Sequence, residues 1–337
     1  YAKSPINLII SPRIYSTSFN SPTPSIYNRR KGLSGSTQMA EDPIIATDNS
    51  LKKLELERSD DTVSRFLGGL NHTIRKLVFR VISSGPIPQH IAFILDGNRR
   101  FAKKWKMTEG AGHKAGFLAL MSVLKYCYEI GVKYVTVYAF SLDNFNRRPD
   151  EVQYVMDLMQ EKIEGFLKEL SLVNKYGVRV MFIGDLKRLY EPVRVAAEKA
   201  MAATAGNTKT YLLVCVAYTS SHEIPRAVYE SCEEKNGVMN ENGSVNGDVN
   251  TGNGSEVVVK MVDIEKHMYM AVAPDPDILV RSSGETRLSN FLLWQTTNCL
   301  LYSPKELWPE MGFWPLVSCI LEFQKNYKYL EKKKKQA

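Results

Sequence analysis

Short apolar runs alternate with longer amphipathic stretches along the chain after residue 86. The runs are apolar at consecutive positions, which is typical of strands buried on both faces of a parallel sheet. They predict strands at 90–95, 132–140, 178–183, 211–217, 278–281 and 299–302. Apolar residues that recur every three or four positions predict helices near 113–130, 151–175, 191–205, 221–234 and 313–330.

This alternation predicts an α/β fold, with a single domain built on a central, mostly parallel sheet of about six strands covered by helices. We place the domain at residues 86–331 and a basic tail at 332–337. Asn and Gly make up more than half of residues 236–255, so we expect a disordered insertion there.

The segment before the domain has two parts. Apolar residues at helical spacing, with basic residues between them, predict an amphipathic helix over 61–85. This helix either lies in a membrane interface or docks on the core of the protein. Residues 1–60 are expected to be a disordered or targeting tail. Residues 1–38 lack acids, as organellar transit peptides do, whereas Met39 would make an ordinary start.

The formal net charge of +8 is concentrated at the two ends of the chain. Residues 1–38 and 325–337 each carry an excess of five positive charges, so the rest of the chain is slightly acidic. This pattern argues against a nucleic-acid-binding body. It favours either attraction of the ends to an anionic membrane surface or simply solvated tails. No apolar run reaches the ~18 residues needed to span a bilayer, so membrane contact would be peripheral.

The five cysteines are scattered, without a Cys-x-x-Cys pair, and lie mostly in apolar stretches. They are typical of reduced core residues in an intracellular protein.

Three predicted strands are followed directly by polar residues that suit phosphate binding. The first leads into Asp96, Gly97, Asn98, Arg99 and Arg100; the second into Ser141, Asn144 and Arg147; the fifth into Arg281, Arg287 and Ser289. Carboxyl ends of parallel strands meet at one edge of a sheet, where ligands bind. An aspartate there is a candidate ligand for Mg²⁺, which takes its other ligands from water and substrate phosphates. We therefore expect a diphosphate-handling enzyme, although a capping role explains any one of these residues alone.

The ordered motifs at 90–100, 112–116, 138–148 and 281–295 resemble those of the cis-prenyltransferases, the undecaprenyl and dehydrodolichyl diphosphate synthase family. Within the family the chain is most similar to the plant dehydrodolichyl diphosphate synthase and rubber-type group. The resemblance implies an enzyme that adds isopentenyl diphosphate units, in cis, to an allylic diphosphate such as farnesyl diphosphate, with Mg²⁺ as cofactor. The products would be dehydrodolichyl diphosphate or a rubber precursor.

The resemblance also assigns roles to residues. Asp96 would bind Mg²⁺ between the two substrates, and His113, Ser141 and Asn144 would lie at the reacting centre. The allylic diphosphate would be held by Gly97, Asn98, Arg99, Arg100 and Arg147, and isopentenyl diphosphate by Arg281, Arg287 and Ser289. Apolar residues of two helices are either ordinary core or the lining of a tunnel for the growing chain: Phe117, Leu120, Leu124, Val155, Leu158, Met159 and Ile163.

Three positions depart from the family pattern. Glu109 stands where many members have arginine, and Leu300 stands where bacterial members have a glutamate metal ligand. No arginine or glycine follows Gly312, so the Arg-x-Gly of bacterial members is missing. This resembles eukaryotic subunits that depend on a Nogo-B-receptor-like partner subunit, and we expect little activity from the chain alone.

A noncatalytic scaffold subunit of such a complex is the alternative, but scaffold subunits lose the aspartate and arginine motifs that this chain keeps. Aspartate-rich trans-prenyltransferase motifs and nucleotide-binding fingerprints are absent from the sequence. The family and the amphipathic helix suggest the cytosolic face of the endoplasmic reticulum membrane. The transit-like segment keeps a plastid location open.

Overall fold

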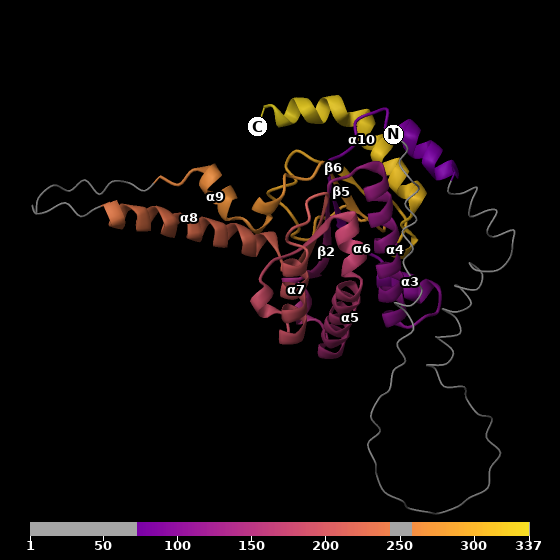
Figure 1. The fold of residues 1–337 in the computed structure, drawn as a ribbon, viewed down its shortest axis with the longest axis horizontal. Helices are drawn as coiled ribbons and strands as arrows, with labels where there is room; N and C mark the ends of the chain where they lie inside the picture. The colour runs from indigo at the N-terminus through magenta and orange to yellow at the C-terminus, as the bar shows by residue number, and fades with distance from the viewer. Residues whose placement is uncertain (1–72, 243–257, 337) are drawn as a thin grey trace, which may run out of the picture. The chain divides into compact units, whose positions relative to one another are not determined.

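The structure, a computed structural model, describes residues 73–242 and 258–336 (Figure 1). Its strands are β1 (His90–Ile94), β2 (Tyr134–Ser141), β3 (Val178–Ile183), β4 (Thr210–Tyr218), β5 (Ile278–Arg281) and β6 (Leu300–Tyr302). After a helical segment at 73–82, the α-helices are α3 (Asn98–Lys104), α4 (Glu109–Ile130), α5 (Pro149–Lys168), α6 (Leu170–Tyr176), α7 (Glu191–Ala203), α8 (Ser220–Asn242), α9 (Met261–His267) and α10 (Phe313–Lys334). Short 3₁₀ turns are η2 (Leu142–Asn146), η3 (Leu186–Arg188), η4 (Tyr269–Val272) and η5 (Trp308–Glu310).

The six strands form one sheet in the order β3-β4-β2-β1-β5-β6, and every pairing is parallel. The predicted α/β fold with a parallel six-stranded sheet is therefore confirmed. β1 lies in the middle of the sheet, between β2 and β5. The carboxyl ends of these three strands are consequently neighbours.

One face of the sheet is covered by α4, α5, α7 and α10. Alternate residues of β1 and β2, including Ile91 and Val137, pack with α4 and α10 in one buried cluster. A second cluster joins α5 and α7 to β3 and β4. The buried consecutive positions of the strands reflect this cover together with that of the opposite face.

The opposite face is covered mainly by irregular chain. Ala92 and Leu279 point to this side, where they pack in a cluster with Met270, Phe291 and Leu292. The last two residues lie between β5 and β6, outside any helix or strand. Helices thus pack against one face, and irregular chain, including the segment after β5 that carries part of the candidate site, packs against the other.

Element boundaries differ from expectation at several places. The sequence did not predict α3, because its seven residues, NRRFAKK, show too short an apolar pattern. The next helix, α4, begins at Glu109, where the side chain of Thr108 accepts a hydrogen bond from the Ala111 amide. The helix predicted over 151–175 is two helices, separated at Glu169. The short helix α9 was also not predicted.

Two predicted segments lie partly outside the described residues. The disordered insertion predicted over 236–255 is helical up to Asn242, where α8 ends, and residues 243–255 lie outside the described ranges. The tail over 1–60 and most of the amphipathic helix lie outside them as well. In the described part of that helix, 73–82, Phe79 and Ile82 are buried against α4 and α10.

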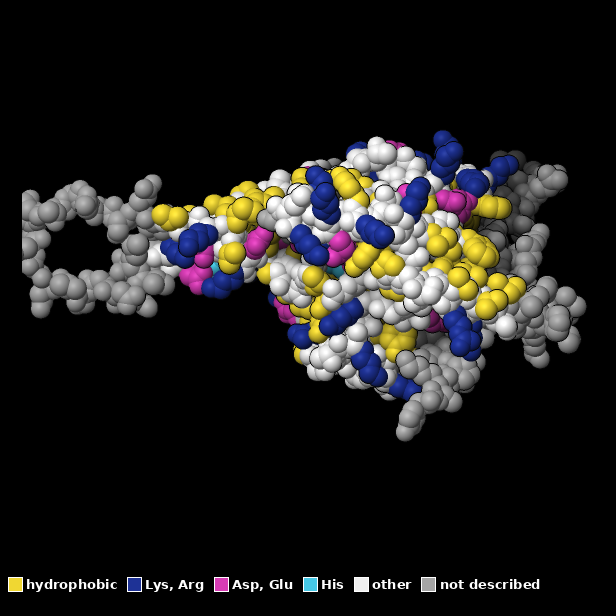
Figure 2. Space-filling model, turned by 90° about the horizontal axis from the view of Figure 1, so that it is seen from above, with side chains coloured by type: hydrophobic (Ala, Val, Ile, Leu, Met, Phe, Trp, Pro, Cys, Tyr) yellow, Lys and Arg dark blue, Asp and Glu magenta, His cyan; other side chains and the backbone are white. Residues whose placement is uncertain are grey.

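The same short helix also presents an apolar face to solvent. Ile74, Leu77 and Val81 are exposed, and so are Trp314 and Leu321 of α10. On the face of the molecule seen in Figure 2, apolar patches are interrupted by Lys and Arg side chains. Within the described ranges, no helix is long and apolar enough to cross a bilayer.

Candidate active site at the carboxyl edge of the sheet

The candidate site lies where β2, β1 and β5 end. Asp96 follows β1 by two residues, Arg281 is the last residue of β5, and Ser141 is the last residue of β2. Because β1 pairs with both other strands, the three polar segments predicted from the sequence leave the sheet at the same edge.

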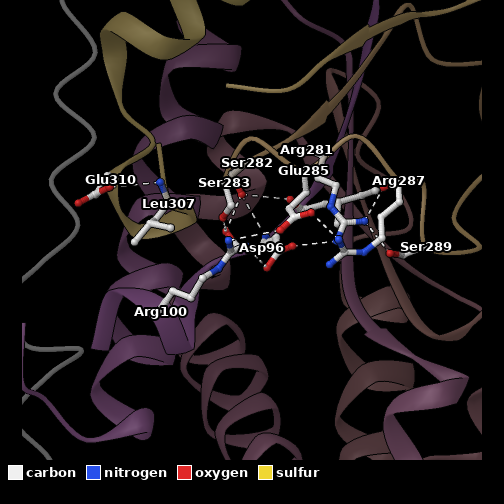
Figure 3. A network of polar contacts seen from close by, with 11 residues as sticks. Asp96, Arg100, Arg281, Ser282, Ser283, Glu285, Arg287, Ser289, Leu307 and Glu310 are labelled. Carbon is white, nitrogen blue, oxygen red and sulfur yellow. Dashed lines mark hydrogen bonds and ion pairs between the residues drawn. The ribbon is translucent and has the colours of Figure 1, made fainter. Parts of the chain in front are cut away.

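Two arginines bracket the Asp96 carboxylate (Figure 3). Arg281 Nη2 donates a hydrogen bond to Asp96 Oδ2 at 2.8 Å, and Arg100 Nη2 lies 3.2 Å from Oδ1. Arg281 comes from β5, whereas Arg100 lies on α3, one helical turn beyond Asp96. The segment after β1 thus supplies the carboxylate and one arginine of this cluster, and β5 supplies the other arginine.

This cluster fixes the charge of the aspartate. Partial burial opposes ionisation of Asp96, but hydrogen bonds and positive charge from Arg281 and Arg100 outweigh it and lower the pKa of the carboxyl below its ordinary value. Asp96 is therefore ionised at neutral pH, which is the form that a divalent cation binds.

The segment after β5 folds back onto Arg281. Arg281 Nη1 donates to Ser289 Oγ at 2.6 Å and to the carbonyl oxygen of Arg287. Its side chain is nearly buried, and its Nε has no hydrogen-bond partner within the described ranges. Ser283 and Ser289 both have positive φ angles, 77° and 49°, which non-glycine residues rarely adopt. Such backbone is often found at binding sites, where the surrounding contacts hold it in place.

Glu285 connects the remaining arginines. It forms an ion pair with the guanidinium of Arg287, and its other oxygen lies 3.4 Å from Arg100 Nη1. Five predicted site residues therefore belong to one network of contacts: Asp96, Arg100, Arg281, Arg287 and Ser289.

The main chain at Asp96 is held as firmly as its side chain. The Asp96 carbonyl oxygen accepts hydrogen bonds from Ser282 Oγ at 2.7 Å, from Ser283 Oγ at 2.9 Å and from the Trp308 amide at 2.9 Å. Gly97 follows at φ 111°, and a Cβ there would lie 2.6 Å from Ser283 Oγ. Only glycine suits both this conformation and this close approach.

Asn98 begins α3 against two glycines of α4. A Cβ on Gly112 would lie 2.3 Å from the Asn98 carbonyl oxygen, and one on Gly116 would lie 2.2 Å from Asn98 Oδ1. The Gly116 carbonyl accepts a hydrogen bond from Trp308 Nε1 at 2.8 Å. The glycines thus let α3 pack closely against α4, and this packing positions the residues that follow Asp96.

The polar segment after β2 forms a capped turn. The Asp143 amide donates to Ser141 Oγ, and the Ser141 amide donates to Asn144 Oδ1, both at 3.1 Å. These contacts form the capping box of η2. Ser141 and Asn144 therefore have a structural role that is sufficient to explain them, and their catalytic role stays a prediction.

A second arginine pair meets on Glu151. Arg147 Nη1 lies 2.7 Å from Glu151 Oε1, and Arg99 Nη1 lies 3.8 Å from the same oxygen. Arg99 belongs to α3 and Glu151 to α5, so this carboxylate bridges the polar segments that follow β1 and β2. The ring of His113, on α4, lies 6.4 Å from that of Tyr154 on α5, measured between centroids.

Sequence reasoning did not select Ser282, Ser283, Glu285, Trp308 or Glu151. Glu285 had a usable signal, because an acid between the two arginines of one predicted phosphate-binding loop is a natural partner for them. Glu151 also had one, since it follows Arg147 by four residues within a predicted helix. The contacts of Trp308 depend on chain distant in sequence and left no local signal.

The described residues contain no group of three or more His, Cys, Asp or Glu side chains placed to hold a metal. The residues present nevertheless fit Mg²⁺, because one ionised carboxylate can suffice when diphosphates and water supply the other ligands. Two surface cavities, of about 520 and about 700 Å³, lie elsewhere, one between α5 and α7 and one around His222.

The known proteins that this chain resembles are prenyltransferases and prenyl diphosphate synthases. Residues 94–331 match a prenyltransferase family model described as putative undecaprenyl diphosphate synthase. The chain is 57% identical over 268 residues to dehydrodolichyl diphosphate synthase 6 of Arabidopsis thaliana, covering 78% of this chain and 91% of the relative. It is 53% identical over 285 residues to a rubber cis-polyprenyltransferase of Hevea brasiliensis, covering 81% and 95%.

A human relative is named as a subunit of a dehydrodolichyl diphosphate synthase complex, with 42% identity over 254 residues, 75% of this chain and 72% of the relative. Among solved structures, lavandulyl diphosphate synthase from Lavandula x intermedia, in complex with dimethylallyl diphosphate, superposes with a TM-score of 0.61. That match has 28% sequence identity and covers 71% of this chain and 95% of the other.

Proposed function

This chain belongs to the cis-prenyltransferase family, and from that membership we propose that it elongates an allylic diphosphate with isopentenyl diphosphate to give a long cis-polyprenyl diphosphate. The relatives named as dehydrodolichyl diphosphate synthases and as a rubber cis-polyprenyltransferase support this reaction. The observation that carries it in this chain is the cluster of Asp96, Arg100 and Arg281 at the carboxyl edge of the sheet.

The chemistry of the reaction suits this cluster. Cleavage of the allylic carbon–oxygen bond leaves negative charge on the departing pyrophosphate. Guanidinium groups that are already oriented stabilise such charge without reorganising at the moment of reaction. Arg100, Arg99 and Arg147 would hold the allylic diphosphate, and Arg281, Arg287 and Ser289 would hold isopentenyl diphosphate.

Mg²⁺ is the proposed cofactor, and Asp96 would hold it. When bound, a divalent cation supplies further positive charge to the diphosphate groups. The low pKa of Asp96 keeps this ligand ionised, and the hydrogen bonds from Ser282, Ser283 and Trp308 keep its main chain in one position. These residues prepare the site for the cation and the diphosphates together.

A partner subunit of the Nogo-B-receptor type is part of the proposal. The human relative named as a complex subunit supports it. The edge strand β6 is short, and Leu301 on it is exposed, as is Leu293 in the irregular chain that leads to it. An exposed apolar sheet edge is suited to contact with another protein. We also propose that the enzyme works at the cytosolic face of the endoplasmic reticulum membrane or in a plastid.

Incubation with labelled isopentenyl diphosphate and farnesyl diphosphate tests the reaction. We expect Mg²⁺-dependent polyprenyl synthesis that a chelator abolishes, with little product unless a partner subunit is added. Asp96→Asn should lower synthesis at least about 100-fold, because the carboxylate that would bind the cation is lost.

Asp185→Asn is the matched control. Asp185 also lies beyond the carboxyl end of a strand, β3, and forms an ion pair with Arg188 at 3.3 Å, but it lies outside the three polar segments. This variant should stay within about twofold of the unmodified chain. Unchanged synthesis by the Asp96→Asn complex, with assembly intact, would instead identify the chain as a scaffold subunit.

A further inference from the structure

Glu223, in the first turn of α8, is a fully buried carboxylate that the proposed reaction does not use. Three neutral groups donate hydrogen bonds to it: the Tyr218 hydroxyl at 2.5 Å, the Met270 amide at 3.0 Å and Gln295 Nε2 at 3.1 Å. These donors belong to β4, to η4 and to the irregular chain between β5 and β6. Because a buried carboxylate without donors is strongly disfavoured, these contacts hold the three segments together.

The side chains that donate to Glu223 are themselves buried. Tyr218 and Gln295 are 0% and 5% exposed. Burial, reinforced by the Glu223 carboxylate, raises the pKa of Tyr218 well above its ordinary value, so the hydroxyl keeps the proton that it donates. Hydrogen bonds are strong in such surroundings, and a polar group that loses its partner there is costly. The cluster therefore keeps its members in one arrangement.

The start of α8 also binds the chain that follows Ser289. The Ser220 amide donates to the Asn290 carbonyl oxygen at 2.8 Å, and the Ser221 amide donates to Asn290 Oδ1 at 3.0 Å. In return, Asn290 Nδ2 donates to Ser221 Oγ at 2.7 Å, and the Leu293 amide donates to Ser220 Oγ at 2.9 Å. The first amides of a helix have no partner within the helix, so this segment supplies partners that α8 needs.

The backbone of the segment depends on such contacts. Ser289, Asn290 and Leu292 have φ angles of 49°, 59° and 48°. Left-handed backbone is unfavourable for serine and leucine, and it persists only where the surrounding structure enforces it. Ser289 is the first of these residues, and its hydroxyl accepts the hydrogen bond from Arg281 (Figure 3). The geometry of the candidate site therefore depends on what holds this segment.

We propose that Glu223 is a positioning residue for isopentenyl diphosphate, and that it acts through residues 289–295 on Ser289 and Arg281. This inference rests on the proposed function, which assigns those two residues to that diphosphate. With Glu223 in place, the segment keeps one geometry and Ser289 Oγ stays 2.6 Å from Arg281 Nη1. Without it, Gln295 loses its acceptor, and the segment can relax from its left-handed backbone.

Initial rates with the two substrates varied separately, and with partner subunit present, test the proposal. Glu223→Gln keeps the size of the side chain but replaces one acceptor oxygen by an NH₂ group, which faces a donor of the cluster whichever way the amide turns. We expect the KM for isopentenyl diphosphate to rise about tenfold and the KM for farnesyl diphosphate to stay within about twofold. A loss of folded enzyme alone would lower kcat and leave both KM values unchanged.

A double variant shows whether Glu223 acts through Ser289. Ser289→Ala removes the hydroxyl that faces Arg281 and should itself raise the KM for isopentenyl diphosphate. Adding Glu223→Gln should raise this KM little further, since variants that break one chain of contacts are not additive. Fully additive effects would overturn the proposal.

Asp277→Asn is the matched control. Asp277 directly precedes β5, at the end of the strand opposite to Arg281, and its carboxylate accepts hydrogen bonds from the amides of Gln89 at 2.6 Å and His90 at 3.1 Å. The variant disturbs a carboxylate that also joins separate segments, but at the amino edge of the sheet. It should lower stability and leave both KM values unchanged.

The outcomes are distinguishable. Gln295→Leu removes one donor and leaves the other two on Glu223, so it should shift the same KM even if Glu223→Gln fails to fold. An unchanged KM for isopentenyl diphosphate in the folded variants, an equal rise in both KM values, or the same rise in Asp277→Asn overturns the role of Glu223. Absence of any incorporation by the unmodified chain with its partner overturns the proposed function instead.

Discussion

Glu151 organises two guanidinium groups although it cannot itself bind a phosphate. Its side chain is 11% exposed, and it lies 2.7 Å from Arg147 and 3.8 Å from Arg99. Without this carboxylate, two like charges would lie near each other at the amino-terminal end of α3 with no counterion between them. We infer that Glu151 is a positioning residue for the allylic diphosphate.

Replacing Glu151 by alanine should therefore lower kcat/KM for the allylic diphosphate by about 10- to 100-fold, since a charge-assisted hydrogen bond contributes about 1.5–3 kcal/mol. Glu151→Gln, which can still accept a hydrogen bond, should be affected less. Steady-state kinetics with varied farnesyl diphosphate would measure both.

Glu198→Ala provides the comparison for Glu151. Arg194 and Glu198 form an ion pair of the same spacing on α7, at 3.1 Å, but both side chains are well exposed. Loss of an exposed pair has little effect. An equal loss of activity in the two alanine variants would show that Glu151 has no special role.

At the scale of elements, the sequence predicted best where the physical signal was local. All six strands were found, because an unbroken apolar run is a strong sign of a strand buried on both faces. Asp96 and Arg281 were selected for the same reason, since each directly follows such a run. α3 was not predicted, because close packing on Gly112 and Gly116, rather than an apolar stripe of its own, stabilises it. Ion pairing between Asp96 and Arg281 depends on strand order, which local patterns do not specify.

The helical segment at 73–82 docks on the core, as one alternative left open by the sequence expected, and membrane contact through its exposed side stays a prediction. Phe79 and Ile82 dock on the core, while Leu77 and Val81 are 62% and 65% exposed. Lys76 and Arg80 lie beside the exposed apolar residues. One face of the helix packs on the core, and the other carries exposed apolar residues beside basic ones, a pattern that is typical of membrane-binding helices.

Changing Leu77 and Val81 together to aspartate should reduce binding to vesicles that contain anionic lipid at least about tenfold, because apolar area is lost and negative charge is added. Co-sedimentation would measure the bound fraction. Val262→Asp on α9, where the valine is 72% exposed, is the control and should bind normally. Undiminished binding by the double variant would exclude this helix as the contact.

At the scale of the whole molecule, a buried histidine ties the amino ends of the central strands together. His90 begins β1, and its ring nitrogens lie 2.6 Å from the Pro274 carbonyl oxygen and 2.7 Å from Thr136 Oγ1 on β2. Burial disfavours the charged ring and, despite the hydrogen bond to Pro274, lowers the pKa of His90 to about 4 from an ordinary value of 6.5. The fold therefore requires the neutral ring.

This requirement makes the stability of the fold depend on pH. The unfolded chain takes up a proton at His90 below pH 6.5, whereas the folded chain does so only near pH 4, so stability falls as the pH falls between these values. His90 alone should reduce the free energy of unfolding by about 2 kcal/mol between pH 7 and pH 5. Denaturant titration at both values would measure this change. His90→Gln should be less stable at pH 7 but should lose less on acidification, and an equal loss in both proteins would contradict the assignment.

The network around Asp96 and Glu285 has one more consequence. Arg100, Arg281 and Arg287 each already have a carboxylate of the protein as counterion, so an arriving diphosphate exchanges one anion for another instead of neutralising free cations. Recognition would then owe more to the fixed geometry of the guanidinium groups than to long-range attraction, and added salt should weaken it only mildly.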